Sequence, residues 1–189
     1  MSNLTDFFPS GGGGLTPKFE EFNSSGTFTP SQALIDAGGY IEVFLVAGGG
    51  RSSSNNYGGS GGEVIIQNMY LTSTSDCIVT IGAAAASGGT GGSSVFTGSS
   101  AGGTDITSLG GKGSSGSSQV DRMGAGFAAQ YVSGGYGAGS GGSGVFGYGA
   151  GGSASVGFGG VTRGKANSGQ GSQNGNAAGS GYCLIKWYE

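Results

Sequence analysis

Glycine content is the feature that most limits what this chain can fold into. Of its 189 residues, 48 are glycine, more than three times the usual share of about 7%. Each ordered glycine costs roughly 0.5–1 kcal/mol more chain entropy than an alanine would. A folded state with many ordered glycines therefore needs dense backbone hydrogen bonding, or partner chains that share the burial. On this ground we expect the protein to oligomerise.

The rest of the composition argues against a disordered chain. Hydrophobic residues make up 35% of the sequence and aromatic residues 10%, which is more than disordered chains normally carry. The apolar residues are also clustered in short runs rather than scattered. We therefore predict a mainly β fold, with a small β-sandwich or jelly-roll-like base that carries long glycine-rich loops.

Short apolar runs predict where the strands lie. The strongest is 40–47, which is nearly all apolar and is expected to be buried on both faces. Phe19, Phe22 and Phe28 flank a turn at 23–26, which predicts either a hairpin or two edge strands. Further strands are predicted at 63–71, 77–81, 94–97 and 182–188.

Three glycine-rich segments separate these strands, at 48–62, 82–93 and 98–181. The last shows almost no strand signal, yet it is too long to be a structureless loop inside a compact domain. Glycines recur in it at three-residue intervals, as at Gly110 and Gly113, and three residues per turn is the period of polyproline II. This spacing favours packed polyglycine II helices. Other glycines recur at every second residue, so irregular loops remain the alternative.

Residues 1–17 are predicted to form a flexible N-terminal arm on the glycine-rich β domain of residues 18–189. Phe7, Phe8 and Pro9 make a short apolar plug, and the glycines at 11–14 make a flexible hinge. A plug on a hinge is suited to docking into a larger assembly. The alternative is a disordered tail.

The composition also excludes several function classes. The chain has no histidine, which rules out His-based catalytic triads and His-ligated metal sites. Its two cysteines cannot form a four-cysteine zinc site, and its acidic residues are spread out. We predict that the protein is not an enzyme and that it has no metal or cofactor. The net charge of −3 opposes binding to nucleic acid, and no apolar run is long enough for membrane insertion.

The two cysteines, Cys77 and Cys183, both fall in predicted strands among apolar neighbours. A free cysteine behaves as a small buried hydrophobic residue. We therefore predict two buried thiols, with a disulfide between them as the alternative.

Aromatic residues within the glycine-rich segments are the candidate binding residues. Tyrosine on loops of small residues supplies a large contact area at low entropic cost, and aromatic rings also suit stacking on sugars. The alternative is that these rings pin the loops to one another. The candidates are Tyr57, Tyr131, Tyr136, Phe146, Tyr148 and Phe158.

Five segments, taken in their order along the chain, resemble the glycine-rich domain of bacteriophage tail-fibre and virion proteins. They are 22–30, 41–50, 78–83, 91–96 and 179–188. The composition is also similar to that of phage tail-tip adhesins built on packed polyglycine II helices.

The resemblance implies a phage structural protein that is assembled in the host cytoplasm and resides in the virion. Its glycine-rich loops would bind a host surface receptor, either a glycan or an outer-membrane protein. Phe7, Phe8 and Pro9 would attach it to other virion proteins, and by analogy with phage fibres a homotrimer is expected. The alternative is a capsid-decorating or head-fibre protein attached through its N-terminal arm.

Overall fold

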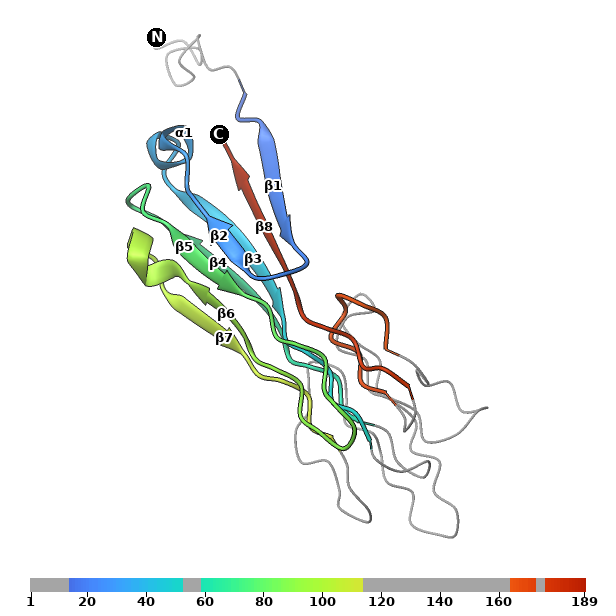
Figure 1. Ribbon diagram of the computed structural model, residues 1–189. Helices are drawn as coiled ribbons and strands as arrows, with labels where there is room; N and C mark the ends of the chain where they lie inside the picture. The colour runs from blue at the N-terminus through green and yellow to red at the C-terminus, as the bar shows by residue number, and fades with distance from the viewer. Residues whose placement is uncertain (1–13, 53–58, 114–163, 173–175) are drawn as a thin grey trace, which may run out of the picture.

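The computed structural model describes residues 14–52, 59–113, 164–172 and 176–189. Over these residues the chain is mainly β, with two four-stranded antiparallel sheets and two helices of at most five residues (Figure 1). The prediction of a mainly β fold is confirmed. The elements are β1 (Pro17–Phe22), β2 (Gly26–Phe28), α1 (Gln32–Asp36), β3 (Tyr40–Val46), β4 (Val64–Tyr70), β5 (Cys77–Thr80), β6 (Ser94–Thr97), the 3-10 helix η2 (Gly98–Ala101), β7 (Asp105–Ser108) and β8 (Tyr182–Tyr188).

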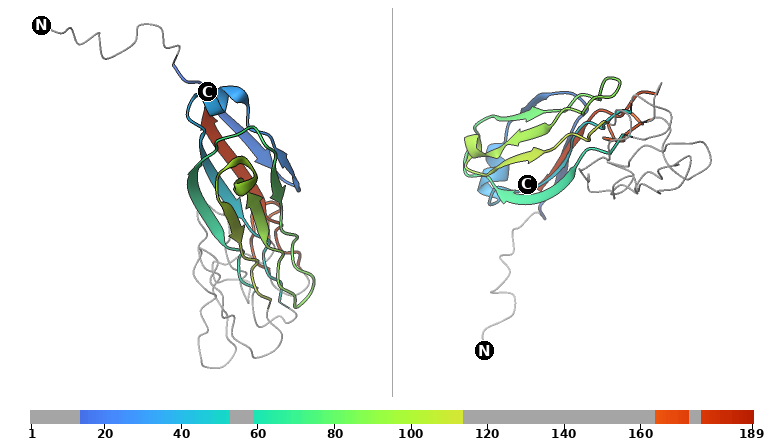
Figure 2. Two further views of the ribbon diagram at one scale, coloured as in Figure 1. Left: turned by 90° about the vertical axis from the view of Figure 1, so that its left-hand side faces the viewer. Right: turned by 90° about the horizontal axis from the view of Figure 1, so that it is seen from below.

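The two sheets face each other across one hydrophobic core (Figures 1 and 2). The first sheet has the strand order β1-β8-β3-β4 and the second has β2-β5-β6-β7. Strand β5 shows the alternation that such packing requires, because Cys77 and Val79 are buried while Ile78 and Thr80 are exposed. The largest side chains of the core that are fully buried are Phe28, Phe96, Leu34, Ile41, Leu45, Leu71 and Ile185.

Strand β3 lies inside the first sheet, between β8 and β4. Its residues from Val43 to Val46 are all buried, so the prediction of burial on both faces is confirmed for this half of the strand. Val43 and Leu45 belong to the core between the sheets, while Phe44 and Val46 belong to a second apolar cluster. Tyr40, at the other end of β3, is exposed.

Strands β1 and β2 belong to different sheets, and each lies at the edge of its own. The prediction of two edge strands is therefore confirmed, and the alternative of a hairpin is wrong. The turn between them crosses from one sheet to the other, which lets Phe22 and Phe28 both point into the shared core. Paired backbone also begins before the predicted boundary at residue 18, because Thr16 N donates to Glu189 O (2.7 Å) and Glu189 N donates to Thr16 O (3.1 Å).

The beginning of segment 98–181 is a correction to the sequence analysis, which expected almost no strand there. Residues 98–101 form η2, and β7 follows it and pairs with β6. Ile106 enters the core with 3% of its surface exposed. It is the single large apolar residue of β7, so the strand makes no apolar run that the sequence could reveal.

Both cysteines are free and buried, which confirms the prediction of two buried thiols. Cys77 lies on β5 and Cys183 on β8, both within the core. Burial raises the pKa of the Cys183 thiol to about 12, with a smaller contribution from the charge of Glu20. Burial is also the largest cause that raises the pKa of Cys77.

Beyond one end of the two sheets, the chain continues as glycine-rich segments that pack against one another (Figure 1). Strands β3, β5 and β7 run into this region, and β4, β6 and β8 emerge from it. We call it the glycine bundle. Its described residues are 47–52, 59–63, 81–93, 109–113, 164–172 and 176–181.

Hydrogen bonds between segments of the bundle recur at three-residue intervals. In three cases, two N–H groups that lie three residues apart in one segment donate to two carbonyl oxygens that lie three residues apart in another. The two segments run in opposite directions. A β-strand would instead repeat every two residues, so the bundle is not a simple extension of the sheets. The donor–acceptor pairs are Gly48–Gly92 (2.9 Å) with Arg51–Gly89 (3.1 Å), Gly59–Ser172 (3.0 Å) with Gly62–Gly169 (2.7 Å), and Ser60–Lys112 (2.9 Å) with Glu63–Leu109 (2.9 Å).

Residues 48–50 are bonded in several directions at once. The N–H groups of Gly48, Gly49 and Gly50 donate to Gly92, Gly179 and Ser60, respectively, at 2.8–2.9 Å. Three successive N–H groups thus reach three different segments. Their carbonyl oxygens also accept hydrogen bonds, from the N–H groups of Gly111, Ala85 and Ser172 respectively. This segment therefore lies at the centre of the bundle.

The glycines at this centre leave no room for a side chain. A Cβ atom on Gly48 would lie 2.0 Å from the carbonyl oxygen of Ala83, and one on Gly49 would lie 2.1 Å from that of Gln170. Real Cβ atoms essentially never come within 3.0 Å of another heavy atom in this way. Glycine is therefore required here by the proximity of neighbouring backbone.

Two buried serines join the sheets to the bundle. Ser94 Oγ donates to Val46 O (2.7 Å) and accepts from Gly82 N (2.9 Å), so it links β6, β3 and the segment after β5. Ser108 Oγ donates to Glu63 O at 2.6 Å. Both serines have no exposed surface. Buried backbone polar groups require hydrogen-bond partners. The two serine hydroxyls supply such partners where the hydrogen bonds between the strands end.

We predict that Gly49→Ala destabilises the fold by roughly 1–3 kcal/mol, the usual cost of overpacking. The added methyl group would collide with the backbone of Gln170, which belongs to another segment and cannot swing away as a side chain would. The thermal midpoint should fall by several degrees. Gly14→Ala is the matched control, since a Cβ there meets nothing within 4 Å. Equal midpoints for the two variants would contradict this account of the bundle.

We also predict that both thiols resist alkylation in the folded protein. The raised pKa of Cys183, about 12, leaves almost no thiolate at pH 8, and the thiolate is the reactive form. Iodoacetamide at pH 8 should label the native protein far more slowly than the protein in guanidinium, where both cysteines should react. Mass spectrometry measures the number of alkylated cysteines per molecule. Rapid double labelling of the native protein would refute the burial of the thiols.

Candidate functional site

All of the residues predicted to bind or to attach lie outside the described residues. Tyr57 falls between residues 52 and 59, and the plug of Phe7, Phe8 and Pro9 precedes residue 14. The other five candidates fall within 114–163, namely Tyr131, Tyr136, Phe146, Tyr148 and Phe158. Their roles therefore stay predictions.

The described chain nevertheless determines where these stretches connect. Ser52, Gly113 and Ser172 are the residues at which the described chain breaks off, and each belongs to the glycine bundle. The chain resumes at Gly59, Gly164 and Asn176, again within the bundle. The stretches that hold the six candidate aromatic residues are thus joined to the rest of the protein at the bundle.

The start of the described chain lies at the opposite end of the molecule. Strand β1 begins beside the end of β8, and Figure 1 places both away from the bundle. The stretch that holds Phe7, Phe8 and Pro9 therefore joins the protein at the end remote from the bundle. The two sets of candidate residues are attached at different ends.

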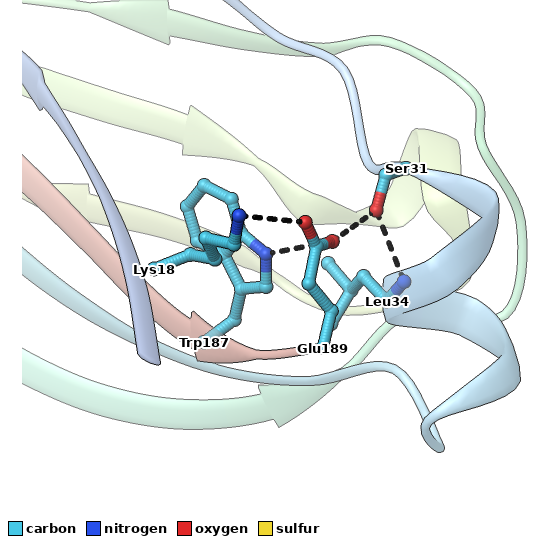
Figure 3. Close-up of polar contacts among 5 residues, drawn as sticks. All are labelled: Lys18, Ser31, Leu34, Trp187 and Glu189. Carbon is cyan, nitrogen blue, oxygen red and sulfur yellow. Dashed lines mark hydrogen bonds and ion pairs between the residues drawn. The ribbon is translucent and has the colours of Figure 1, made fainter. Parts of the chain in front are cut away.

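A cluster of polar contacts around Glu189 organises this remote end (Figure 3). The indole N–H of Trp187 donates to Glu189 Oε2 (3.1 Å), and the hydroxyl of Ser31 donates to the same oxygen. Lys18 Nζ lies 3.7 Å from Oε1. Ser31 also caps α1, because its hydroxyl accepts from Leu34 N (3.0 Å). The carboxylate thus connects β1, β8 and the start of α1.

These contacts stabilise the charged form of the carboxyl group. The hydrogen bond from Ser31 is the main cause that lowers the pKa of Glu189, followed by the bond from Trp187, with the charge of Lys18 adding to both. Hydrogen bonds to a carboxylate favour ionisation in this way.

A groove of about 590 Å³ runs across the outer face of the first sheet, near the same end. Phe19 and Tyr188 line it and are 69% and 54% exposed. The ion pair between Lys186 Nζ and Glu42 Oε1, at 2.9 Å, also lines the groove. The groove therefore combines exposed aromatic rings with charged groups.

The sequence analysis did not recognise this groove. It assigned these residues to strands and expected 40–47 to be buried on both faces. The signal was the alternation at one end of each strand, with Tyr40 and Glu42 on β3 and Lys186 and Tyr188 on β8. Residues two apart on a strand share a face, and here that face is open to solvent.

The part of the chain that the structure describes contains neither a cluster of metal-ligating residues nor a membrane-spanning helix. Within residues 14–52, 59–113, 164–172 and 176–189, no three acidic, histidine or cysteine residues gather as a metal site would need. None of the helices in the same ranges is long and apolar enough to cross a membrane. No family model, curated protein or solved structure matches the chain.

We predict that Glu189→Gln weakens the dependence of stability on acid pH. Because the folded-state pKa of Glu189 is lowered, its carboxylate adds stability above its ordinary pKa of 4.5, and this stability is lost as the pH falls through the lowered value. The variant lacks this contribution at every pH. Its urea midpoint should therefore be lower than that of the wild type near neutral pH, and the two should converge as the pH falls below 4.5.

The control for this experiment is Glu21→Gln, which alters an exposed carboxyl group on β1. It should reproduce the wild-type profile. Parallel profiles for the wild type and Glu189→Gln, without convergence in acid, would show that the contacts in Figure 3 do not affect ionisation.

Proposed function

We propose that the protein is a bacteriophage virion structural protein, a tail-fibre or tail-tip adhesin that binds a host surface receptor through its glycine-rich segments. The observation that carries the proposal is the separation of the two ends. The N-terminal arm joins the protein at the end marked by the Glu189 cluster, and the stretches with the candidate aromatic residues join at the glycine bundle. An adhesin needs such an arrangement, with one end for the virion and the other for the receptor.

We further propose that the bundle consists of packed polyglycine II helices. Two features support this: the hydrogen bonds that recur every three residues, and the three successive N–H groups of Gly48, Gly49 and Gly50 that bond to three different segments. A helix with three residues per turn directs its N–H groups in this way. Such a bundle would be a rigid base for the binding loops, which is where recognition residues commonly lie.

The receptor would be a glycan or an outer-membrane protein, contacted by Tyr57, Tyr131, Tyr136, Phe146, Tyr148 and Phe158. Other virion proteins would hold the arm through Phe7, Phe8 and Pro9. A homotrimer would let several copies share the burial of the glycine-rich segments and would present several receptor sites together.

The second candidate function is that of a capsid-decorating or head-fibre protein, in which attachment is the essential contact. The groove beside the arm favours it, because Phe19 and Tyr188 expose aromatic surface at the attachment end. Aromatic residues of this kind are enriched at protein interfaces.

The first experiment tests attachment, which both functions require. Deleting residues 1–13 should abolish incorporation into virions, and the thermal midpoint of the truncated protein checks that it still folds. Incorporation is measured by quantitative immunoblotting of purified particles. Full incorporation of the truncated protein would exclude the arm as the means of attachment.

The second experiment separates the two functions. Replacing Tyr136 and Tyr148 together by serine should slow adsorption of virions to host cells at least several-fold if the protein is an adhesin, and should leave incorporation intact. Ile78→Ser is the control, because this exposed apolar residue lies on β5 of the second sheet. Unchanged adsorption of the double variant would favour the decorating function over the adhesin.

A further inference from the structure

Charge is unevenly distributed between the two parts of this chain. The glycine-rich segments 48–62, 82–93 and 109–181 hold five basic residues and one acidic residue. The remaining residues hold two basic and nine acidic ones. The net charge of −3 therefore conceals a basic part and an acidic part.

The structure places the described basic residues of the first part in one region. Arg51, Lys112 and Lys165 all lie in the glycine bundle, and their segments touch there. Arg51 N bonds to Gly89, the carbonyl of Lys112 accepts from Ser60 N, and the carbonyl of Lys165 lies 2.3 Å from the position of a Cβ on Gly179. The single acidic residue of the described bundle, Glu63, lies at its junction with β4, where its Oε2 accepts from Leu109 N (2.8 Å).

The basic residues of the two parts differ in their pairing. Lys18 and Lys186, on the sheets, form ion pairs with Glu189 and Glu42 at 3.7 and 2.9 Å. Among the ion pairs of the described residues, none involves Arg51, Lys112 or Lys165. The three cations of the bundle are thus left without an acidic partner in this part of the chain.

Lys165 and Arg51 each have a local feature that suits an anionic ligand, exposure for the first and an unpaired donor for the second. Lys165 is exposed and lines a hollow of about 490 Å³ whose other walls are small residues, among them Ala84, Ala178 and Ser180. Arg51 has a buried Nε atom with no hydrogen-bond partner in the described structure. An unpaired buried donor is unfavourable, and an anionic acceptor would satisfy it.

We propose that the glycine bundle binds an anionic polysaccharide, through carboxylate or phosphate groups that pair with Arg51, Lys112 and Lys165. This inference rests on the proposed function, since it specifies the class of receptor that the same end would meet. A local excess of one charge attracts ligands of the other even when the net charge of the protein is unfavourable. Arginine suits phosphate and carboxylate in particular, because it presents its donors as a planar fork.

The small number of described cations in the bundle favours a polysaccharide over a nucleic acid. Duplex DNA carries one negative charge per about 1.7 Å of its axis, and three cations would leave most of so dense a series of charges without a partner. Three cations distributed over separate segments suit a ligand whose charges are sparse and whose remaining groups are neutral hydroxyls.

The test measures binding of the full-length protein to carboxymethyl dextran, with unmodified dextran as the neutral counterpart of the same backbone. Binding should be confined to the carboxymethyl form and should weaken steeply as salt is added. The variant R51Q/K112Q/K165Q should lose on the order of a hundredfold in affinity, since each cation near an anionic surface contributes on the order of 1 kcal/mol. The variant K112Q/K165Q, which spares the buried Nε of Arg51, should show most of the loss and guards against misfolding of the triple variant.

The matched control is K18Q/K186Q, which removes the same charge as K112Q/K165Q but from the sheets. It should bind like the wild type. Equal losses for these two double variants would overturn the proposal, because only net charge would then matter. Tighter binding to duplex DNA than to carboxymethyl dextran at equal charge concentration would also overturn it, in favour of a nucleic-acid ligand.

This experiment is independent of virion adsorption. If adsorption depends on Tyr136 and Tyr148 while the polysaccharide test fails, the adhesin function stands and its receptor is not an anionic glycan. If the polysaccharide test succeeds while adsorption is unchanged in the tyrosine variant, the charge-based inference stands and the tyrosines are not the contacts.

Discussion

The close approach of backbone to backbone in the glycine bundle is the constraint on which the rest of the structure depends. Even where the bundle meets the sheets, a Cβ on Gly62 would lie 2.2 Å from Ala47 O and one on Gly181 would lie 2.3 Å from Val46 O. Segments this close have no side chains between them, so hydrophobic burial cannot hold them together. Backbone hydrogen bonds hold the segments together instead. The strands, which the apolar core fixes in place, align the segments that follow β3, β5 and β7 and those that precede β4, β6 and β8. The buried hydroxyls of Ser94 and Ser108 form hydrogen bonds where the sheets meet the glycine bundle.

The strands show how far sequence patterns reach. Strands β3 and β8 were predictable because short runs rich in apolar residues, bounded by glycines, are typical of strands. Strand β7 was not, since Ile106 alone anchors it and its remaining residues resemble a loop. Phe22 and Phe28 predicted strands on either side of a turn, but not that this turn changes sheets. That depends on long-range pairing, because β1 pairs with β8 and β2 with β5. The periodicity of apolar residues indicates which face of a strand is buried, but it does not specify which other strand pairs with it.

In the glycine bundle, too, the sequence pattern does not specify which segments pair. Glycine spacing of three residues favoured polyglycine II helices, while spacing of two residues left irregular loops as the alternative. In three pairs of described segments the hydrogen bonds recur every three residues. The partners could not be foreseen: Gly49 bonds to Gly179, and neither residue carries a side chain that would encode the match. The candidate site was likewise only partly accessible to sequence reasoning. Aromatic residues in glycine-rich stretches were evident, whereas the groove with Phe19 and Tyr188 depends on strands from both ends of the chain lying side by side.

Net charge is a poor guide to the partners of a molecule built in this way. At physiological ionic strength the Debye length is about 8 Å, and seven residues of a strand such as β8 span roughly 23 Å. The carboxylate of Glu189 at one end of β8 is therefore largely screened from the bundle at the other. Several acidic groups of the sheets are also engaged, as Glu42 is with Lys186 and Asp105 with the backbone and hydroxyl of Ser99. An anionic surface that approaches the bundle thus meets the local charge of Arg51, Lys112 and Lys165, and the acidic sheets lie beyond the range at which they could repel it.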